Sequence, residues 1–190
     1  MTIPSRSQPT RRRFLLAAAA VSALFAVACG DADDDVIRLG ADQPQPSLED
    51  LQNDDAVGSE VDLTFATFDG DTANFTTYAG TPLVINFFAR TCSACVSEMP
   101  EFEAVFREFG GTVAFVGIST DPRKEDAEIL IEETGITYDL GWDPQGELFA
   151  RFGGFAMPTT VFVTSDGVVH ETWSGVLTGA DLTAKIEELV

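Results

Sequence analysis

Two cysteines separated by two residues, Cys92 and Cys95, have the spacing of a redox-active dithiol. In the first turn of a helix this spacing brings the two sulfurs within bonding distance. Free backbone N–H groups and the positive end of the helix dipole stabilise a thiolate, so we expect a lowered pKa for Cys92. A thiolate at Cys92 would attack a substrate disulfide, and Cys95 would resolve the mixed disulfide that forms. The pair therefore predicts thiol-disulfide chemistry.

Other uses of the cysteine pair are weaker. A CxxC pair is half of a zinc site, but the chain has no second pair and His170 is its only histidine. A purely structural disulfide would close so short a loop that it would constrain the unfolded chain little. We therefore expect neither a metal nor a cofactor at the pair.

The pair lies at the junction of a strand and a helix. Residues 83–88 form a near-continuous apolar run, which is typical of a strand buried on both faces. Apolar side chains then recur at helical spacing from Met99 to Phe109, before two glycines. The other predicted elements are a hairpin (63–68 with 72–75), a buried strand (113–118), a helix that Pro122 opens and Gly135 ends, a short helix (145–152), a second hairpin (159–164 with 168–173) and a final helix (181–189). This order predicts an α/β sandwich around a mixed sheet.

Three segments carry a family resemblance: Asn86-Phe87-Phe88-Ala89-Arg90-Thr91-Cys92-Ser93-Ala94-Cys95, Glu98-Met99-Pro100 and Met157-Pro158-Thr159-Thr160. Together they resemble the thioredoxin-like family, and within it the membrane-anchored TlpA/ResA type, over residues 57–190. The resemblance implies a central mixed sheet flanked by helices, with an N-terminal β-hairpin, and a disulfide between Cys92 and Cys95. It also implies a cis peptide bond before Pro158. Met157, Pro158 and Thr159 would then bind an extended substrate strand beside the pair.

The same resemblance implies an enzyme that exchanges thiols and disulfides of proteins without a cofactor, with Cys92 as nucleophile and Cys95 as resolving thiol. In the TlpA/ResA type the direction is reduction, for example of apocytochrome c before haem attachment. Electrons come from a membrane thiol carrier of the CcdA/DsbD kind. Glu98 matches an acid of this type and would handle protons near the pair, unless it is an ordinary exposed helix residue. Asn86 stands where many thioredoxins have a buried aspartate, and its amide cannot take over proton transfer.

Two residues before the pair depart from the family pattern. Thr91 replaces the tryptophan that usually precedes the first cysteine, which removes an apolar cover over the site. Arg90 either points at the sulfur, where it would favour the thiolate, or faces solvent. A thiol peroxidase of the peroxiredoxin kind is an alternative function, although Ala89 stands where that family has a threonine. A metal-handling binding module is another, although such relatives use wider cysteine spacing together with a histidine.

Charge divides the chain into a short basic start and an acidic remainder. The 190 residues carry a formal net charge of -20, which argues against nucleic-acid binding. Residues 1–28 contain four arginines and no acid, and their apolar run from Phe14 is too short for a membrane span. This pattern predicts an export signal. The run from Thr10 to Leu16 resembles a twin-arginine (Tat) signal, and an ordinary Sec signal with a chance pair of arginines is the alternative.

Cys29 follows the predicted signal at the position where a lipoprotein signal ends. The resemblance implies cleavage before Cys29, its lipidation, and anchoring to the outer face of the cytoplasmic membrane. Lipoprotein signals favour a leucine three residues before the cysteine, and this chain has Ala26 at that position. A soluble secreted protein is therefore the alternative. Residues 29–56 are acidic with few large apolar side chains, which predicts a solvated tether. The folded domain is predicted to span residues 57–190.

Overall fold

The structure is a computed structural model, and it describes residues 56–190. The predicted export signal, the predicted lipidation site Cys29 and all but the last residue of the predicted tether lie outside the described residues. Within residues 56–190, no helix has the length and apolar character that crossing a membrane requires.

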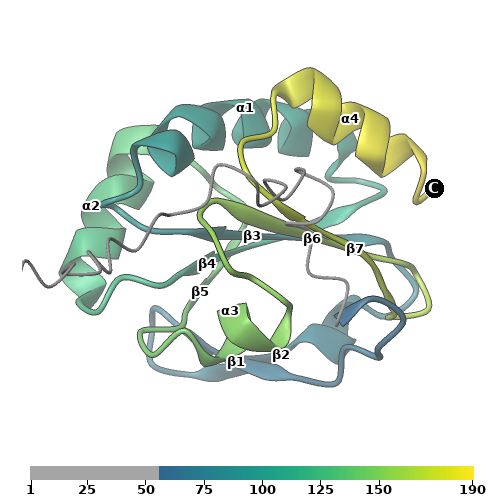
Figure 1. Cartoon of the computed structure of the whole chain (residues 1–190), viewed down its shortest axis with the longest axis horizontal. Coiled ribbons are helices and arrows are strands. Elements are labelled where there is room, and N and C mark those ends of the chain that lie inside the picture. The colour runs from purple at the N-terminus through teal and green to yellow at the C-terminus, as the bar shows by residue number, and fades with distance from the viewer. Residues whose placement is uncertain (1–55) are drawn as a thin grey trace, which may run out of the picture. The chain divides into compact units, whose positions relative to one another are not determined.

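Seven strands form one mixed sheet in the order β2-β1-β5-β4-β3-β6-β7 (Figure 1). Their bounds are β1 Thr64–Thr67, β2 Thr72–Asn74, β3 Leu83–Phe88, β4 Ala114–Ser119, β5 Asp139–Trp142, β6 Thr159–Val163 and β7 Val169–Ser174. Strand β3 runs parallel to β4 and antiparallel to β6, and all six of its residues are buried. The predicted mixed sheet, the N-terminal hairpin β1–β2 and the doubly buried strand are confirmed.

Four α-helices flank this sheet: α1 Ser93–Phe109, α2 Lys124–Thr134, α3 Glu147–Arg151 and α4 Gly179–Glu187. A short 3-10 helix, η2 Phe75–Tyr78, follows β2. Helices α1, α2 and α4 lie on one face of the sheet, and α3 lies on the other (Figure 1). The predicted α/β sandwich, a central mixed sheet flanked by helices, is confirmed.

Each face of the sheet carries its own apolar core, and β3 contributes to both. Val84 and Phe88 pack in the core beneath α1, α2 and α4, whereas Ile85 and Phe87 pack in the core that includes residues of α3 and the β1–β2 hairpin. Successive side chains of a strand point to opposite faces. Asn86 therefore shares the α1 face with Val84 and Phe88.

The described chain enters the sheet at the turn between β6 and β7. Ala56 is already buried, and the N–H of Gly58 donates to the carbonyl of Val169 over 2.8 Å. Three residues further on, the N–H of Val61 donates to the carbonyl of Gly167, also over 2.8 Å. This end of β6 pairs with Leu83, at the start of β3, so the chain enters at the end of β3 that lies away from the cysteines.

Two details differ from the sequence prediction. Strand β5 was not predicted, because its four residues include Asp139 and Gly141 and show no apolar run. A Cβ at Gly141 would lie only 2.5 Å from the Phe65 ring of the neighbouring strand β1, so the pairing of β1 with β5 requires glycine there. Helix α2 begins at Lys124 with Arg123 as its N-cap, so Pro122 precedes the helix instead of opening it.

Candidate active site

The two cysteines form a disulfide at the start of α1. Cys92 is the N-cap residue of that helix, and its Sγ accepts a hydrogen bond of 3.0 Å from the backbone N–H of Cys95. Cys95 is fully buried, whereas Cys92 is partly exposed. Of the two cysteines, Cys92 is therefore the one that another molecule can approach, and Cys95 is shielded within the core.

A buried aspartate fixes the loop that leads from β3 to Cys92. Both carboxylate oxygens of Asp121 lie 3.0 Å from the backbone nitrogen of Arg90, which donates to them. The hydroxyl of Ser119 donates to the same carboxylate over 3.0 Å. Sequence reasoning did not single out Asp121. The available signal was its place after β4, because the carboxyl ends of the parallel strands β3 and β4 meet at one edge.

The side chain of Arg90 is directed toward α2. One of its guanidinium nitrogens lies 3.7 Å from the carboxylate of Asp126, which also binds Arg123 at 2.8 and 2.9 Å. Arg90 is thus a partly exposed member of an ion-pair group with Asp126 and Arg123, and its ion-pair partner is this carboxylate on α2. Beside it a cavity of about 650 Å³ is lined by residues 89–91, residues 120–122, Asp126 and Met157. The small side chain of Thr91 forms part of its wall.

The peptide bond between Met157 and Pro158 is cis, as the family resemblance implies. Pro158 and Thr159 are buried, and the carbonyl of Pro158 already accepts a hydrogen bond of 2.8 Å from Gly175. The hydroxyl of Thr159 donates to the Ala156 carbonyl over 2.6 Å. Met157 is partly exposed, and its backbone N–H and C=O have no hydrogen-bond partner among residues 56–190. Of these three predicted residues, only Met157 offers open groups to a substrate.

Glu98 lies one turn after Cys95 on α1 and is 1% exposed, so it is not a surface residue of the helix. Its Oε1 accepts from Nδ2 of Asn86 over 3.0 Å, and its Oε2 accepts from the backbone N–H of Leu177 over 3.1 Å. Burial raises the pKa of Glu98 to about 7, although both hydrogen bonds act in the opposite direction. Near neutral pH this carboxyl group exists in both protonation states, as a proton carrier must.

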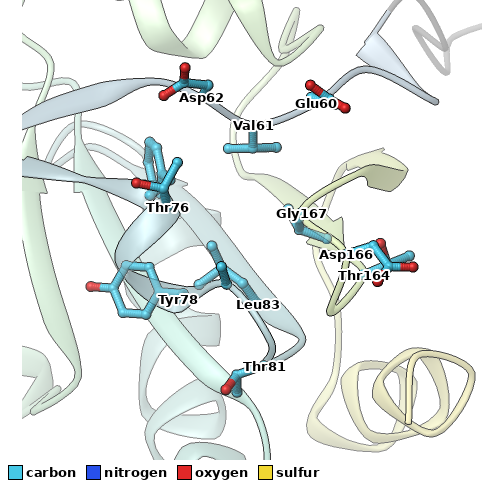
Figure 2. A pocket seen from close by; sticks show the side chains of 13 residues that line it. Glu60, Val61, Asp62, Thr76, Tyr78, Thr81, Leu83, Thr164, Asp166 and Gly167 are labelled. Carbon is cyan, nitrogen blue, oxygen red and sulfur yellow. The ribbon is translucent and has the colours of Figure 1, made fainter.

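A separate cavity of about 270 Å³ lies at the far end of β3 (Figure 2). Leu83 and Val61 line it, and the carboxylates of Glu60 and Asp62 point away from Val61 toward the outside. Leu83 begins β3 and Phe88 ends it, so the length of the strand, roughly 17 Å, separates this cavity from the cysteine end. It is not part of the disulfide site. Among residues 56–190, no group of three or more His, Cys, Asp or Glu side chains could hold a metal ion.

A disulfide at the start of a helix, a cis-proline and a central β-strand that leads into the cysteine loop define a thioredoxin-like protein. Comparison with known families agrees with this class. The chain belongs to the AhpC/TSA family, which matches residues 57–172.

Similar proteins are named for thiol-disulfide chemistry. Thiol-disulfide oxidoreductase ResA of Geobacillus thermodenitrificans is 26% identical over 138 residues, which cover 70% of this chain and 78% of that protein. Thiol:disulfide interchange protein DsbE of Xylella fastidiosa is 28% identical over 150 residues, which cover 77% of this chain and 66% of that protein. With its paired cysteines, the chain is a thiol-disulfide oxidoreductase of the ResA and DsbE kind.

The fold also matches solved structures. A secreted disulfide oxidoreductase of Mycobacterium tuberculosis, homologous to E. coli DsbE, superposes with a TM-score of 0.62 at 22% sequence identity. The match covers 68% of this chain and 97% of that one. At this identity the likeness shows a shared fold.

Proposed function

We propose that this protein reduces disulfides of exported proteins, with Cys92 as the nucleophile and Cys95 as the resolving thiol. The unequal exposure of the two cysteines carries the assignment of roles, because Cys92 is partly exposed and Cys95 is fully buried. The start of α1 supports the same assignment, since its N–H groups stabilise a thiolate on Cys92.

The proposed cycle conserves atoms and electrons. The thiolate of reduced Cys92 attacks one sulfur of the substrate disulfide, and the other substrate sulfur leaves as a thiolate that takes a proton. Cys95 then gives its proton to the carboxylate of Glu98 and attacks Cys92. The substrate sulfur bound to Cys92 leaves as a thiolate and takes the proton that Glu98 holds, so both substrate sulfurs are reduced and the Cys92–Cys95 disulfide re-forms. Two electrons have passed to the substrate.

Two further roles belong to the proposal. The free backbone groups of Met157 would pair with an extended strand of the substrate and hold its disulfide against Cys92, while Pro158 and Thr159 shape that loop. A membrane thiol carrier of the CcdA/DsbD kind would return two electrons to the oxidised pair. Lipidation of Cys29, predicted from its place after the signal, would hold the enzyme at the outer face of the cytoplasmic membrane.

Trapping in cells tests the roles of the two cysteines. In the full chain, Cys95→Ala removes the resolving thiol, so mixed disulfides at Cys92 should accumulate and be released by reductant. The matched control is the double variant Cys92→Ala/Cys95→Ala, which should capture nothing by disulfide bonding. Equal capture by both variants, or none by either, would contradict the assignment.

The direction of electron flow needs its own measurement. Alkylation of free thiols in intact cells should find the wild-type cysteine pair mainly reduced, because the electron donor of a reductase keeps its dithiol reduced. A pair found mainly as the disulfide would indicate an oxidase. Removal of the Cys29 thiol by Cys29→Ser should release the protein from the membrane fraction if Cys29 is the lipid anchor.

A further inference from the structure

Asn86 carries an unpaired polar atom in β3, a strand whose residues are all buried. The side chain is 1% exposed, and its neighbours along β3 are all apolar. Its Nδ2 donates to Glu98 over 3.0 Å and to the hydroxyl of Thr160 over 3.4 Å, whereas its Oδ1 has no partner among the described residues. A buried acceptor without a donor is unfavourable, so this arrangement needs a reason.

The reason lies in how Glu98 is held. The backbone N–H of Leu177 faces Oε2 of Glu98, and a backbone N–H can only donate. A protonated oxygen is a poorer acceptor than the carbonyl oxygen of the same acid, so this contact favours placing the proton of Glu98 on Oε1, which faces Asn86. Two donors, the new O–H and Nδ2, would then point at each other. The amide of Asn86 resolves the conflict by turning its oxygen toward Glu98.

We propose that Asn86 is a positioning residue whose amide follows the protonation state of Glu98: Nδ2 donates to the ionised carboxylate, and after a half-turn Oδ1 accepts the O–H of the acid. The inference deepens the proposed function, because it rests on Glu98 as proton carrier for Cys95. The currently unpaired Oδ1 is the acceptor that the protonated state uses. Glu98 thus keeps its position, and its hydrogen bond to Asn86, whether or not it holds a proton.

Thr160 fits both orientations of the amide. A hydroxyl accepts from Nδ2 in one state and donates to Oδ1 in the other, by rotation of its hydrogen alone. The ionisable groups that act on Glu98 are Glu101 of its own helix and Tyr138 beside β5. Neither is basic, so the donors from Asn86 and Leu177 are what stabilise the charged form. An aspartate in place of Asn86 would instead put a second carboxylate beside the first.

The side-chain amide can be followed directly by NMR in the full chain with its disulfide intact, where neither cysteine titrates. The Asn86 amide signals should shift with a midpoint near the Glu98 pKa of about 7. The nuclear Overhauser effect between these amide protons and Thr160 should be strong above the midpoint and lost below it. In Glu98→Gln the low-pH signals should persist at every pH, because Leu177 forces the Gln oxygen to face it and leaves the NH2 group toward Asn86.

Two variants separate positioning from a merely structural role. Asn86→Leu should move the midpoint of the Glu98 carboxyl carbon signal upward by about one unit, since the charged form loses a charge-assisted hydrogen bond and the neutral form loses only an ordinary one. The matched control is Thr172→Val, which also removes a buried side-chain hydrogen bond, 2.9 Å to the carbonyl of Phe152, in strand β7. That variant should leave the midpoint unchanged.

Several outcomes would overturn the inference: amide signals that do not respond to pH, a Glu98→Gln protein that shows the high-pH signals, or equal midpoints in Asn86→Leu and wild type. None of these readouts requires disulfide exchange. A protein whose amide follows Glu98 but which reduces no protein disulfide would contradict the proposed function and leave the amide switch standing. An enzyme that reduces protein disulfides but whose Asn86 amide does not respond to pH would contradict the amide switch and leave the proposed function standing.

Discussion

The buried carboxyl group of Glu98 should make the folded protein less stable as the pH rises. Burial raises the pKa of Glu98 in the folded chain from the ordinary value of 4.5 to about 7. A raised carboxyl pKa means that the folded state binds the proton more tightly than the unfolded state does. The folded state therefore loses stability between pH 4.5 and pH 7, by about 3 kcal/mol in total at roughly 1.4 kcal/mol per pKa unit.

Replacement of Glu98 by glutamine removes this pH dependence, because the neutral amide has the same shape as the protonated acid and no charge to bury. At pH 4 the free energies of unfolding of wild type and Glu98→Gln should be similar, and at pH 8 they should differ. From pH 4 to pH 8, the free energy of unfolding of Glu98→Gln should rise by about 3 kcal/mol relative to that of wild type. Urea unfolding of the disulfide form measures this change in the free energy of unfolding. If that free energy falls by about 2 kcal/mol per molar urea, the unfolding midpoints of the two proteins at pH 8 should differ by about 1.5 M.

An exposed glutamate on the same helix provides the control. Glu108→Gln removes one acidic charge at the surface of α1, so its stability should follow that of wild type across the pH range. Other titrating groups cancel in the comparison between variants. If Glu98→Gln and wild type lose stability in parallel from pH 4 to pH 8, the buried carboxyl is not the source of the effect, and its role as a proton carrier near neutral pH fails with it.

Three further expectations concern the site and its scaffold. A thiolate absorbance titration of the reduced protein should give a pKa for Cys92 below the ordinary value of about 8.5, and an ordinary value would contradict stabilisation by the helix start. Gly117→Ala should lower the free energy of unfolding by about 1–3 kcal/mol in urea, since its Cβ would lie 2.8 Å from the Tyr138 ring; unchanged stability would show that the ring yields. Thr178→Ala should lower it by about 1 kcal/mol, because Thr178 and Asp181 form the capping box of α4, and the loss should show as a lower thermal midpoint.

Local sequence patterns were sufficient for the centre of the fold. The apolar run 83–88 and the helical spacing from Met99 to Phe109 are properties of neighbouring residues, and both elements stand where they were predicted. The junction between them places the cysteine pair at a helix start, so the chemistry of Cys92 could be inferred before any contact was known.

Contacts between distant segments account for what sequence patterns missed. Strand β5 exists because it pairs with β4 on one side and β1 on the other, and its own four residues give no pattern. The buried carboxyl group of Glu98 accepts a hydrogen bond from the N–H of Leu177, 79 residues further along the chain. Asp121 reaches back 31 residues to fix the loop before Cys92. No local pattern reports pairings at these separations.

The entry of the chain beside the β6–β7 turn bears on how an anchor would leave the disulfide accessible. Residues 56–61 join the sheet at the end of β3 that lies opposite the cysteines. With Cys29 as a lipid anchor, the predicted tether of residues 29–56 would therefore join the domain at the end away from the disulfide, and the attachment would not cover Cys92. A flexible connection of this length would let the same sulfur meet both water-borne substrate proteins and an electron donor embedded in the bilayer.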